Sequence, residues 1–449
     1  MPPLPLVAVI GGGFSGLMTA LHLVRAGTVR VRLIEKSANF AQGAAYCTAN
    51  PDHLLNVRAG NMSAWPDEPG HFARWLAERR PGADAFASRG EYGLYLQDLL
   101  ATADGQTRLS LVADEAAGLV PHRDGWRLDY ASGSSEPVDA VVLALGNPPP
   151  ATPAGIGPEV TGGTLYHADP WRLPPKTVGA AELPTLLIGS GLTMVDVALS
   201  LARSAPGRPM IALSRRGLAP LPHAPTSPLD AWTPPADASP TALLVWLKSE
   251  ARRQGWREAI DALRPYTQAI WRGWNRVQRA RFLRHARPYW DVHRHRLAPN
   301  VAERVDALVS AGRLRFAAGK IVSAAAAAGG AIDLSWRPRG VHDVTVTRTA
   351  RIVNCTGPQG DLLRSDEPLI RHLIATGAIR PDPLRLGVDV DAQSRAIGRD
   401  GRAEQRLHCI GPMTRGGLWE VVAVPDIRQQ SWDLARRLSN AQWVGGEGL

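Results

Sequence analysis

The stretch Val-Ala-Val-Ile-Gly-Gly-Gly-Phe-Ser-Gly at residues 7–16 decides the fold of this 449-residue chain. Its apolar start predicts a buried parallel strand, and its glycines predict a tight turn into a helix. Gly11, Gly13 and Gly16 have the G-x-G-x-x-G spacing, which lets bare backbone approach a pyrophosphate at a helix N-terminus. We therefore expect this turn to bind a dinucleotide.

The sequence after the turn supports that expectation. A helix is predicted over Phe14–Ala26, with Gly27 as its stop. The next predicted strand, 29–35, ends on Glu35, nineteen residues after Gly16, where a carboxylate can accept hydrogen bonds from ribose hydroxyls. A glycine turn with a purely structural role is the alternative, because a glycine triplet alone is a weak signal.

A second fingerprint, Leu-Leu-Ile-Gly-Ser-Gly-Leu-Thr-Met, occupies residues 186–194. Gly189 and Gly191 again follow an apolar strand, but Met194 takes the third position, where a bulkier side chain holds helix and strand farther apart. This match is weaker than the first. Since one such turn holds one dinucleotide, two turns predict two cofactors that exchange electrons.

Two arginines mark the second unit as different from the first. Arg215 follows Gly189 by twenty-six residues and is followed by Arg216, whereas the acid of the first unit follows its first glycine by twenty-four. A guanidinium suits the 2′-phosphate of NADPH, and a carboxylate repels it. We therefore expect NADPH rather than NADH in the second unit. An exposed arginine pair that simply ends a strand is the alternative.

Composition bounds the class of protein. The net charge is +10, from 51 Lys and Arg against 41 Asp and Glu, but the arginines are spread along the chain, so no nucleic-acid partner is expected. No apolar stretch approaches a membrane span, and the first strand begins too early for a signal peptide, so we expect a cytoplasmic protein. Cys47, Cys355 and Cys409 form no C-x-x-C pair, which argues against the dithiol reductases.

Two further apolar strands indicate the domain organisation. Residues 138–147 close on Gly146 and residues 351–357 on Gly357, and proline follows each stretch, as expected where the chain crosses between domains. The prediction is an α/β fold with two Rossmann-like dinucleotide-binding domains, the second inserted in the first. The first domain is predicted to be discontinuous, 1–150 plus 351–449, and the second to occupy 160–350.

A helical cap is predicted over about 241–312 within the second domain. It contains the stretch 284–296, in which seven of thirteen side chains are cationic or titratable. Because Pro, Tyr and Trp interleave with them, a partly buried anion-binding cleft is favoured over a solvated basic face. A zinc site at His285, His293 and His295 is a weaker alternative, since no cysteines or paired carboxylates lie nearby, and no metal is expected.

Seven short motifs carry a family resemblance: Gly11–Gly16, Gly43–Tyr46, Leu54–Val57, Gly60–Ser63, Ala144–Asn147, Gly189–Asp196 and Gly411–Gly416. Through them the chain resembles the FAD/NAD(P)-binding flavoproteins related to class B monooxygenases. Within these it is most similar to the bacterial group that includes nitrosuccinate-forming aspartate monooxygenases. The resemblance implies FAD in the first domain and NAD(P)H in the second.

By position, the resemblance implies a set of cofactor-binding residues in addition to the second turn and its arginines. These are Gly11, Gly13, Phe14, Ser15, Gly16, Glu35, Lys36, Tyr46, Met62, Ser63, Gly146 and Gly411. Asn56 would steer a hydrogen bond to flavin or substrate, or else form a turn with its own backbone. Pro412 follows Gly411 where many flavoproteins have an acid, so Glu420 or backbone donors would have to replace that contact.

The expected chemistry follows from the cofactors and the charges. Arg294, Arg296 and Arg415 would form a basic pocket for a small, acidic amine or amino acid, although Arg415 could instead pair with Glu420. With NADPH and molecular oxygen, the enzyme would N-hydroxylate this substrate through a flavin peroxide. The alternatives are a reductase or dehydrogenase without oxygenation, a Baeyer–Villiger or sulfur monooxygenase, and a redox sensor. A homo-oligomer is possible.

Overall fold

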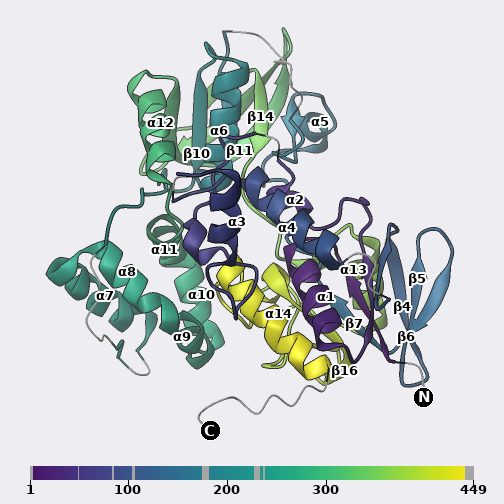
Figure 1. The fold of residues 1–449 in the computed structure, drawn as a ribbon. Helices are drawn as coiled ribbons and strands as arrows, with labels where there is room; N and C mark the ends of the chain where they lie inside the picture. Colours follow the sequence, from purple (N-terminus) through teal and green to yellow (C-terminus); the bar gives the residue numbers. More distant parts are fainter. Residues whose placement is uncertain are drawn as a thin grey trace.

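The computed structural model describes residues 4–48, 50–82, 85–103, 107–173, 182–226, 233–235 and 238–439. A six-stranded sheet with the order β15-β16-β7-β1-β2-β3 forms the first domain, and all neighbours are parallel except β15 and β16. Its strands are β1 (Leu6–Ile10), β2 (Arg30–Ile34), β3 (Leu109–Val112), β7 (Ala140–Leu143), β15 (Arg395–Ile397) and β16 (Ala403–Cys409). An antiparallel sheet of β4 (Ala116–His122), β5 (Gly125–Tyr130) and β6 (Ser135–Val138) flanks it (Figure 1).

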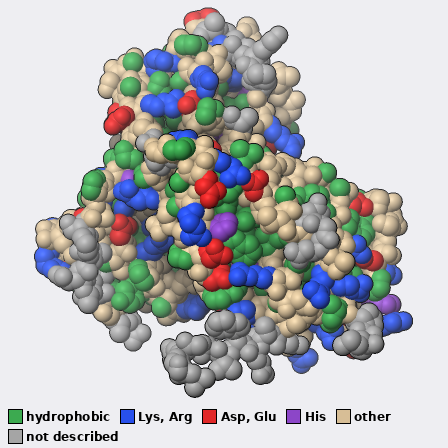
Figure 2. All heavy atoms as spheres, in the orientation of Figure 1, with side chains coloured by type: hydrophobic (Ala, Val, Ile, Leu, Met, Phe, Trp, Pro, Cys, Tyr) green, Lys and Arg blue, Asp and Glu red, His purple; other side chains and the backbone are tan. Residues whose placement is uncertain are grey.

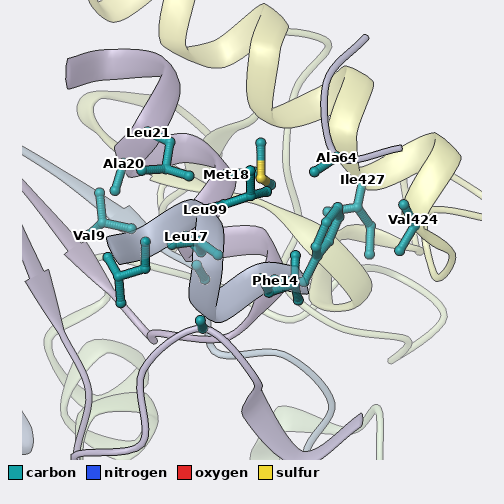
Figure 3. Close-up of a cluster of buried hydrophobic side chains, with 14 of the residues drawn as sticks. Val9, Phe14, Leu17, Met18, Ala20, Leu21, Ala64, Leu99, Val424 and Ile427 are labelled. Carbon is teal, nitrogen blue, oxygen red and sulfur yellow. The ribbon is translucent and has the colours of Figure 1, made fainter. Parts of the chain in front are cut away.

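Helix α1 (Phe14–Ala26) lies at the centre of the first domain, and its bounds are those predicted. It ends at Gly27, whose φ of 75° gives the left-handed C-terminal cap. Helix α14 (Val424–Leu438) and helix α4 (Arg89–Ala103) pack against it. Figure 3 shows the apolar side chains that meet there: Phe14, Leu17 and Met18 of α1, Leu99 of α4, and Val424 and Ile427 of α14. The C-terminal helix therefore helps to hold the first glycine turn in place.

The second domain is a seven-stranded sheet with the order β13-β12-β11-β10-β9-β14-β8. Its strands are β8 (Tyr166–His167), β9 (Thr185–Ile188), β10 (Met210–Ser214), β11 (Leu314–Ala327), β12 (Ala331–Pro338), β13 (Thr345–Thr349) and β14 (Arg351–Asn354). Helices α6 (Leu192–Ser204) and α12 (Pro299–Ser310) share one apolar core with this sheet. The predicted α/β fold with two Rossmann-like units is confirmed. In chain order, the strands of the second sheet all come between β7 and β15 of the first sheet.

The predicted domain boundary at 351 is one strand too early. Strand β14 pairs in parallel with β9, from Arg351 opposite Thr185 to Asn354 opposite Ile188, and so belongs to the second sheet. The chain returns to the first domain only after Asn354. The sequence pattern placed a glycine and a proline at this crossover correctly, but it did not reveal that the strand before them stays with the second sheet.

The helical cap is the lobe of Figure 1 that carries α7, α8 and α9, and it comes between β10 and β11. Its helices are α7 (Pro240–Gln254), α8 (Trp256–Leu263), α9 (Thr267–Gly273), α10 (Arg276–His285) and α11 (Arg287–Arg294). A 3-10 turn at Arg264–Tyr266 separates α8 from α9, because Pro265 has no N–H to continue the helix. Helix α12 lies against the second sheet, so the cap is smaller than predicted.

Acidic side chains are interspersed among the arginines on the face shown in Figure 2, and many arginines there and elsewhere form ion pairs. The excess of positive charge is therefore not gathered into a single basic face in this view. Within the described ranges, no helix is long and apolar enough to cross a membrane.

Buried His22 makes the stability of the first domain depend on pH. It lies on α1 with its ring edge-on to Trp65, and burial above all lowers its pKa from 6.5 to about 4. Because the unfolded chain binds the proton more tightly, the contribution of His22 to stability is fully present above pH 6.5 and is lost as the pH drops toward 4. We expect His22→Leu to flatten the pH dependence of the free energy of unfolding, measured by urea titration, in this range. At the lower end of the range, the parent protein should lose roughly 1–3 kcal/mol that the variant keeps. Parallel curves for the variant and the parent protein would contradict this assignment.

Candidate active site

The first glycine turn brings α1 and β7 into backbone contact. Gly11 has a φ of +107°, and a Cβ there would lie 2.3 Å from the carbonyl oxygen of Ala144. A Cβ on Gly16 would lie 1.8 Å from the Gly11 oxygen, so neither position accepts another residue without a shift of backbone. Gly13 is the N-cap of α1 in extended conformation, without a side-chain cap. This bare helix N-terminus has the shape that a pyrophosphate requires.

Glu35 lies beside this turn, as predicted. One carboxylate oxygen accepts the Gly12 N–H at 2.8 Å, and the other accepts the N–H and hydroxyl of Ser37 at 3.0 and 2.7 Å. The carboxylate therefore stands at the turn where a ribose was expected. Lys36 is directed elsewhere, because its ammonium pairs with Glu367 at 2.7 Å and with Glu115 at 3.6 Å.

The residues expected to contact the flavin differ in whether they already have hydrogen-bond partners within the protein. The ring of Tyr46 is edge-on to Tyr92, and Met62 is buried. Ser63 is also buried, but its hydroxyl donates to backbone oxygens of its own turn at 2.6 and 3.1 Å, which favours a structural role. The backbone oxygen of Asn56 accepts from His223, which ties this segment to the second domain.

Gly411 closes the other side of the first turn. Its φ is +75°, and a Cβ there would lie 2.5 Å from the Ser15 hydroxyl at the start of α1. Its N–H donates to Gln430 of α14 at 2.8 Å. Ser15 and Gly411 are therefore neighbours although they are almost 400 residues apart in the chain. Gly146, after β7, has a φ of +70° and open space around it.

The second turn repeats the construction of the first. Gly189 has a φ of +114°, and a Cβ there would lie 2.4 Å from the oxygen of Cys355, which follows β14. Gly191 is the uncapped N-cap of α6 and has no neighbour within 4 Å of a Cβ position. Met194, in the first turn of α6, is fully buried in the core that this helix shares with the second sheet. Both predicted dinucleotide turns thus have the required local geometry.

The two arginines after β10 have separate roles. Arg216 donates to the backbone oxygens of Arg284 and His285 at 3.1 and 3.3 Å, and its guanidinium lies 5.4 Å from the ring centre of Tyr289. It therefore attaches the cap to the second sheet. Arg215 is exposed and has no ion pair among the described residues. Of the pair, Arg215 is the one available to a phosphate.

Two of the three arginines predicted to form a basic pocket are already neutralised. The Nε of Arg294 donates to buried Glu420 at 2.9 Å, and the Arg294 side chain is itself only 12% exposed. Arg296 forms a two-pronged pair with Asp261, at 3.0 and 2.8 Å, and is 3% exposed. The predicted cationic cleft around residues 284–296 is therefore largely paired internally.

Arg415 differs from the other two, and it does not pair with Glu420. Its Nε donates to the backbone oxygen of Leu386 at 3.1 Å, and no carboxylate pairs with it within the described part of the chain. Burial, assisted by the charge of Arg287, lowers the pKa of Arg415 to about 10, so it remains cationic at neutral pH. It lines a small pocket together with Asn147 and Gln359, beside the turn that follows β7. Of the three predicted arginines, Arg415 is therefore the one available to an anion.

Glu420 joins the first domain to the cap. It adopts the left-handed conformation, with φ +72°, and its carboxylate accepts the Trp290 indole N–H at 2.7 Å in addition to Arg294. Burial opposes its ionisation, but Arg294 and His295 hold its pKa below the ordinary value. The suggested role of Glu420 as a flavin contact gives way to this buried ion pair.

A second polar junction was missed by the sequence analysis. Arg89, at the start of α4, pairs at 3.1 Å with buried Asp196 on α6. The Nε2 atom of His53 lies within hydrogen-bonding distance of the Ser200 hydroxyl, at 2.8 Å, and of the backbone oxygen of Asp196, at 3.1 Å. These contacts connect the two domains next to the second glycine turn. An acid on the buried face of a predicted helix was a usable signal for Asp196, whereas no local pattern marked Arg89 or His53.

The zinc alternative gains no support from the geometry. His293 is bonded through Nδ1 to the backbone oxygen of Tyr289 at 2.7 Å. Over the ranges that the structure covers, no group of three or more His, Cys, Asp or Glu side chains is arranged to hold a metal ion.

Comparison with known proteins agrees with this geometry. Residues 8–148 match the family described as FAD-NAD(P)-binding. The match confirms the predicted cofactor class for the first domain and the resemblance drawn from its motifs. A Baeyer-Villiger monooxygenase of Streptomyces coelicolor is 26% identical over 210 residues, which cover 44% of this chain but 33% of that protein. The chain thus matches about a third of the length of this curated relative.

Solved structures are similar over nearly the whole chain. The ornithine N-hydroxylase of Kutzneria sp. 744, solved with reduced FAD, NADP+ and L-ornithine, has a TM-score of 0.67 at 15% identity and is matched over 98% of this chain and 99% of its own. The FAD-bound cadaverine monooxygenase of Erwinia amylovora has a TM-score of 0.68 at 12% identity, over 97% and 94%. At these identities the likeness establishes the fold.

We expect the Arg294–Glu420 pair to be structural, and to show this in unfolding experiments. Arg294→Met leaves a buried carboxylate without its cation, at a cost of about 3–5 kcal/mol. The double variant Arg294→Met/Glu420→Gln should recover much of that loss in urea unfolding. Arg287→Met is the control, because its pair with Asp291 is 39% exposed on both sides and should contribute at most about 1 kcal/mol. Equal effects of the two single variants would disprove the assignment.

Proposed function

We propose that this protein is an FAD- and NADPH-dependent monooxygenase that hydroxylates the nitrogen of a small amine or amino acid. The observation that carries the proposal is the pair of glycine turns, each built by close contact between a helix N-terminus and a neighbouring parallel strand, in two nested domains. Two dinucleotides held in one chain allow a hydride to pass from a soluble donor to a bound acceptor. The full-length likeness to ornithine and cadaverine hydroxylases supports oxygenation of nitrogen.

The residues around the first turn fit FAD. Gly11 and Gly16 allow the close backbone contacts that form this turn, Gly13 leaves the N-terminus of α1 without a side-chain cap, and Glu35 is placed for the ribose. FAD, when bound, accepts the hydride and activates oxygen. Helix α14 begins with Val424 and Pro425 next to this site, so its positive end stabilises negative charge there.

The second domain would hold NADPH. Gly189 and Gly191 present the N-terminus of α6, and Arg215 supplies the cation for a 2′-phosphate. In the pocket beside β7, Arg415 would orient a substrate carboxylate, while Asn147 offers an amide for hydrogen bonding. Asn56 stays a candidate for the flavin side of the site. The substrate carboxylate would supply the acidic partner that Arg415 lacks among the described residues.

The cysteines argue against a dithiol reductase. Burial raises the pKa of Cys355 well above its ordinary value and that of Cys409 to about 12, so both stay protonated at neutral pH. Cys47 is exposed and has no cysteine beside it in the sequence. Since the thiolate is the reactive form, no dithiol pair is available for electron transfer. Baeyer–Villiger oxygenation is the second candidate, because curated relatives with that activity match 44% of the chain.

The decisive experiment is NADPH oxidation by the FAD-loaded protein under air. We expect a small amine or amino acid to stimulate turnover and to give a product hydroxylated on nitrogen. The amount of this product, measured by mass spectrometry, is compared with the amount of hydrogen peroxide released. Cyclic ketones serve as the comparison substrates, and lactone formation without amine hydroxylation would favour the Baeyer–Villiger activity. Oxygen-independent reduction of a dye, with no oxygenated product from any substrate, would refute the monooxygenase.

Arg215 should determine the choice of nicotinamide cofactor. We expect Arg215→Ala to raise the KM for NADPH about tenfold and to leave the KM for NADH nearly unchanged, since only NADPH carries the 2′-phosphate. Arg315→Ala is the matched control, because Arg315 is an exposed arginine at the opposite end of the same sheet. A parent protein that prefers NADH, or a variant with unchanged selectivity, would rule out this role.

A further inference from the structure

The cap contains an aromatic pocket that the proposed chemistry leaves unused. We define the aromatic pocket by its five rings, Trp271, Trp274, Phe282, Trp290 and Trp419. Leu243, Leu263 and Ile270 complete its apolar wall, and Thr267 also lines it. The pocket has a cavity volume of about 40 Å³ and is partly open to solvent. Four of its rings belong to the cap, and Trp419 comes from the C-terminal segment of the first domain.

Three of the four tryptophans of this pocket have indole N–H groups that already have partners within the protein. The indole N–H groups of Trp271, Trp274 and Trp290 donate to Gly416, Ala238 and Glu420 at 2.8, 2.8 and 2.7 Å. The ring faces remain, and Trp271 stacks on Trp419 with 4.6 Å between centroids. A wall of satisfied indoles offers dispersion and π contacts but few hydrogen bonds. It therefore suits an aromatic or branched alkyl group and disfavours a charged one.

The aromatic pocket is adjacent to the anion pocket of Arg415. Leu386 lines the anion pocket, accepts a hydrogen bond from Arg415, and packs against the aromatic cluster. Trp419 follows Arg415 by four residues, and the guanidinium of Arg287 lies 5.9 Å from its ring centre. An unpaired cation and an apolar wall thus share one short segment of chain, which is the arrangement that an amphipathic carboxylate requires.

We infer that the aromatic pocket binds the apolar side group of the substrate while Arg415 binds its carboxylate. This rests on the proposed monooxygenase and narrows its substrate to amino acids with an aromatic or branched alkyl side chain. A dicarboxylate such as aspartate does not fit, because its second carboxylate would meet ring faces instead of a free cation. Arg294 and Arg296, which were expected to receive it, already have carboxylate partners.

The test is calorimetric binding to the oxidised, FAD-loaded protein, with 3-phenylpropionate as probe and succinate as the dicarboxylate comparison. We expect 3-phenylpropionate to bind at least about tenfold more tightly, because burial of a phenyl ring adds to the shared carboxylate contact. Leu243→Phe, which fills the pocket from α7, should remove most of this advantage. Arg415→Gln should weaken both ligands.

Two controls keep the result interpretable. Leu247→Phe, one turn along α7 and outside the pocket lining, should leave the binding of 3-phenylpropionate within about twofold of the parent. Ile270→Phe fills the pocket from a half-buried position and replaces Leu243→Phe if that variant does not fold. Succinate binding as tightly as 3-phenylpropionate, or both filling variants binding like the parent, would overturn the inference.

Binding to oxidised protein requires neither NADPH nor oxygen. A protein that binds 3-phenylpropionate in this pocket but hydroxylates no amine would therefore refute the monooxygenase alone. A protein that hydroxylates amines but binds 3-phenylpropionate no better than succinate would refute the pocket assignment alone.

Discussion

The close approach of two glycines to the carbonyl groups of neighbouring strands is the constraint on which the structure depends. Gly11 contacts the backbone after β7, and Gly189 contacts the backbone after β14, at nearly the same Cβ-to-oxygen distances of 2.3 and 2.4 Å. A side chain at either position would push a helix off its sheet. The bare helix N-termini that result are the features that can accept phosphate.

The cap is held by buried charge rather than by apolar contact alone. Glu420, Trp290 and Arg294 form a junction between the C-terminal segment and α11, and Trp419 inserts among the cap tryptophans beside it. A buried carboxylate is costly without its cation. Orientations of the cap that would separate Glu420 from Arg294 are therefore disfavoured, even where they would keep apolar contacts. Arg415, which lines the neighbouring anion pocket, precedes Glu420 by five residues.

The sequence predicted local elements well and long-range partners poorly. The bounds of α1 followed from apolar spacing and a C-terminal glycine, which act within a few residues. The sheet to which β14 belongs depends on a pairing with Thr185, about 170 residues away, and no local pattern records that.

The charged residues show the same limit more sharply. The run of arginines and histidines at 284–296 predicted a cationic cleft because charge was counted along the chain. In the fold, Arg294 pairs with Glu420 and Arg296 pairs with Asp261. The number of cationic residues in the run therefore overstates the number that lack an acidic partner. Arg415, an isolated arginine between Thr414 and Gly416, is the member of the predicted set that keeps no carboxylate partner within the described chain. Since a half-buried cation without an acidic partner costs free energy that a ligand can recover, an arginine of this kind indicates a binding site more reliably than a dense cationic run.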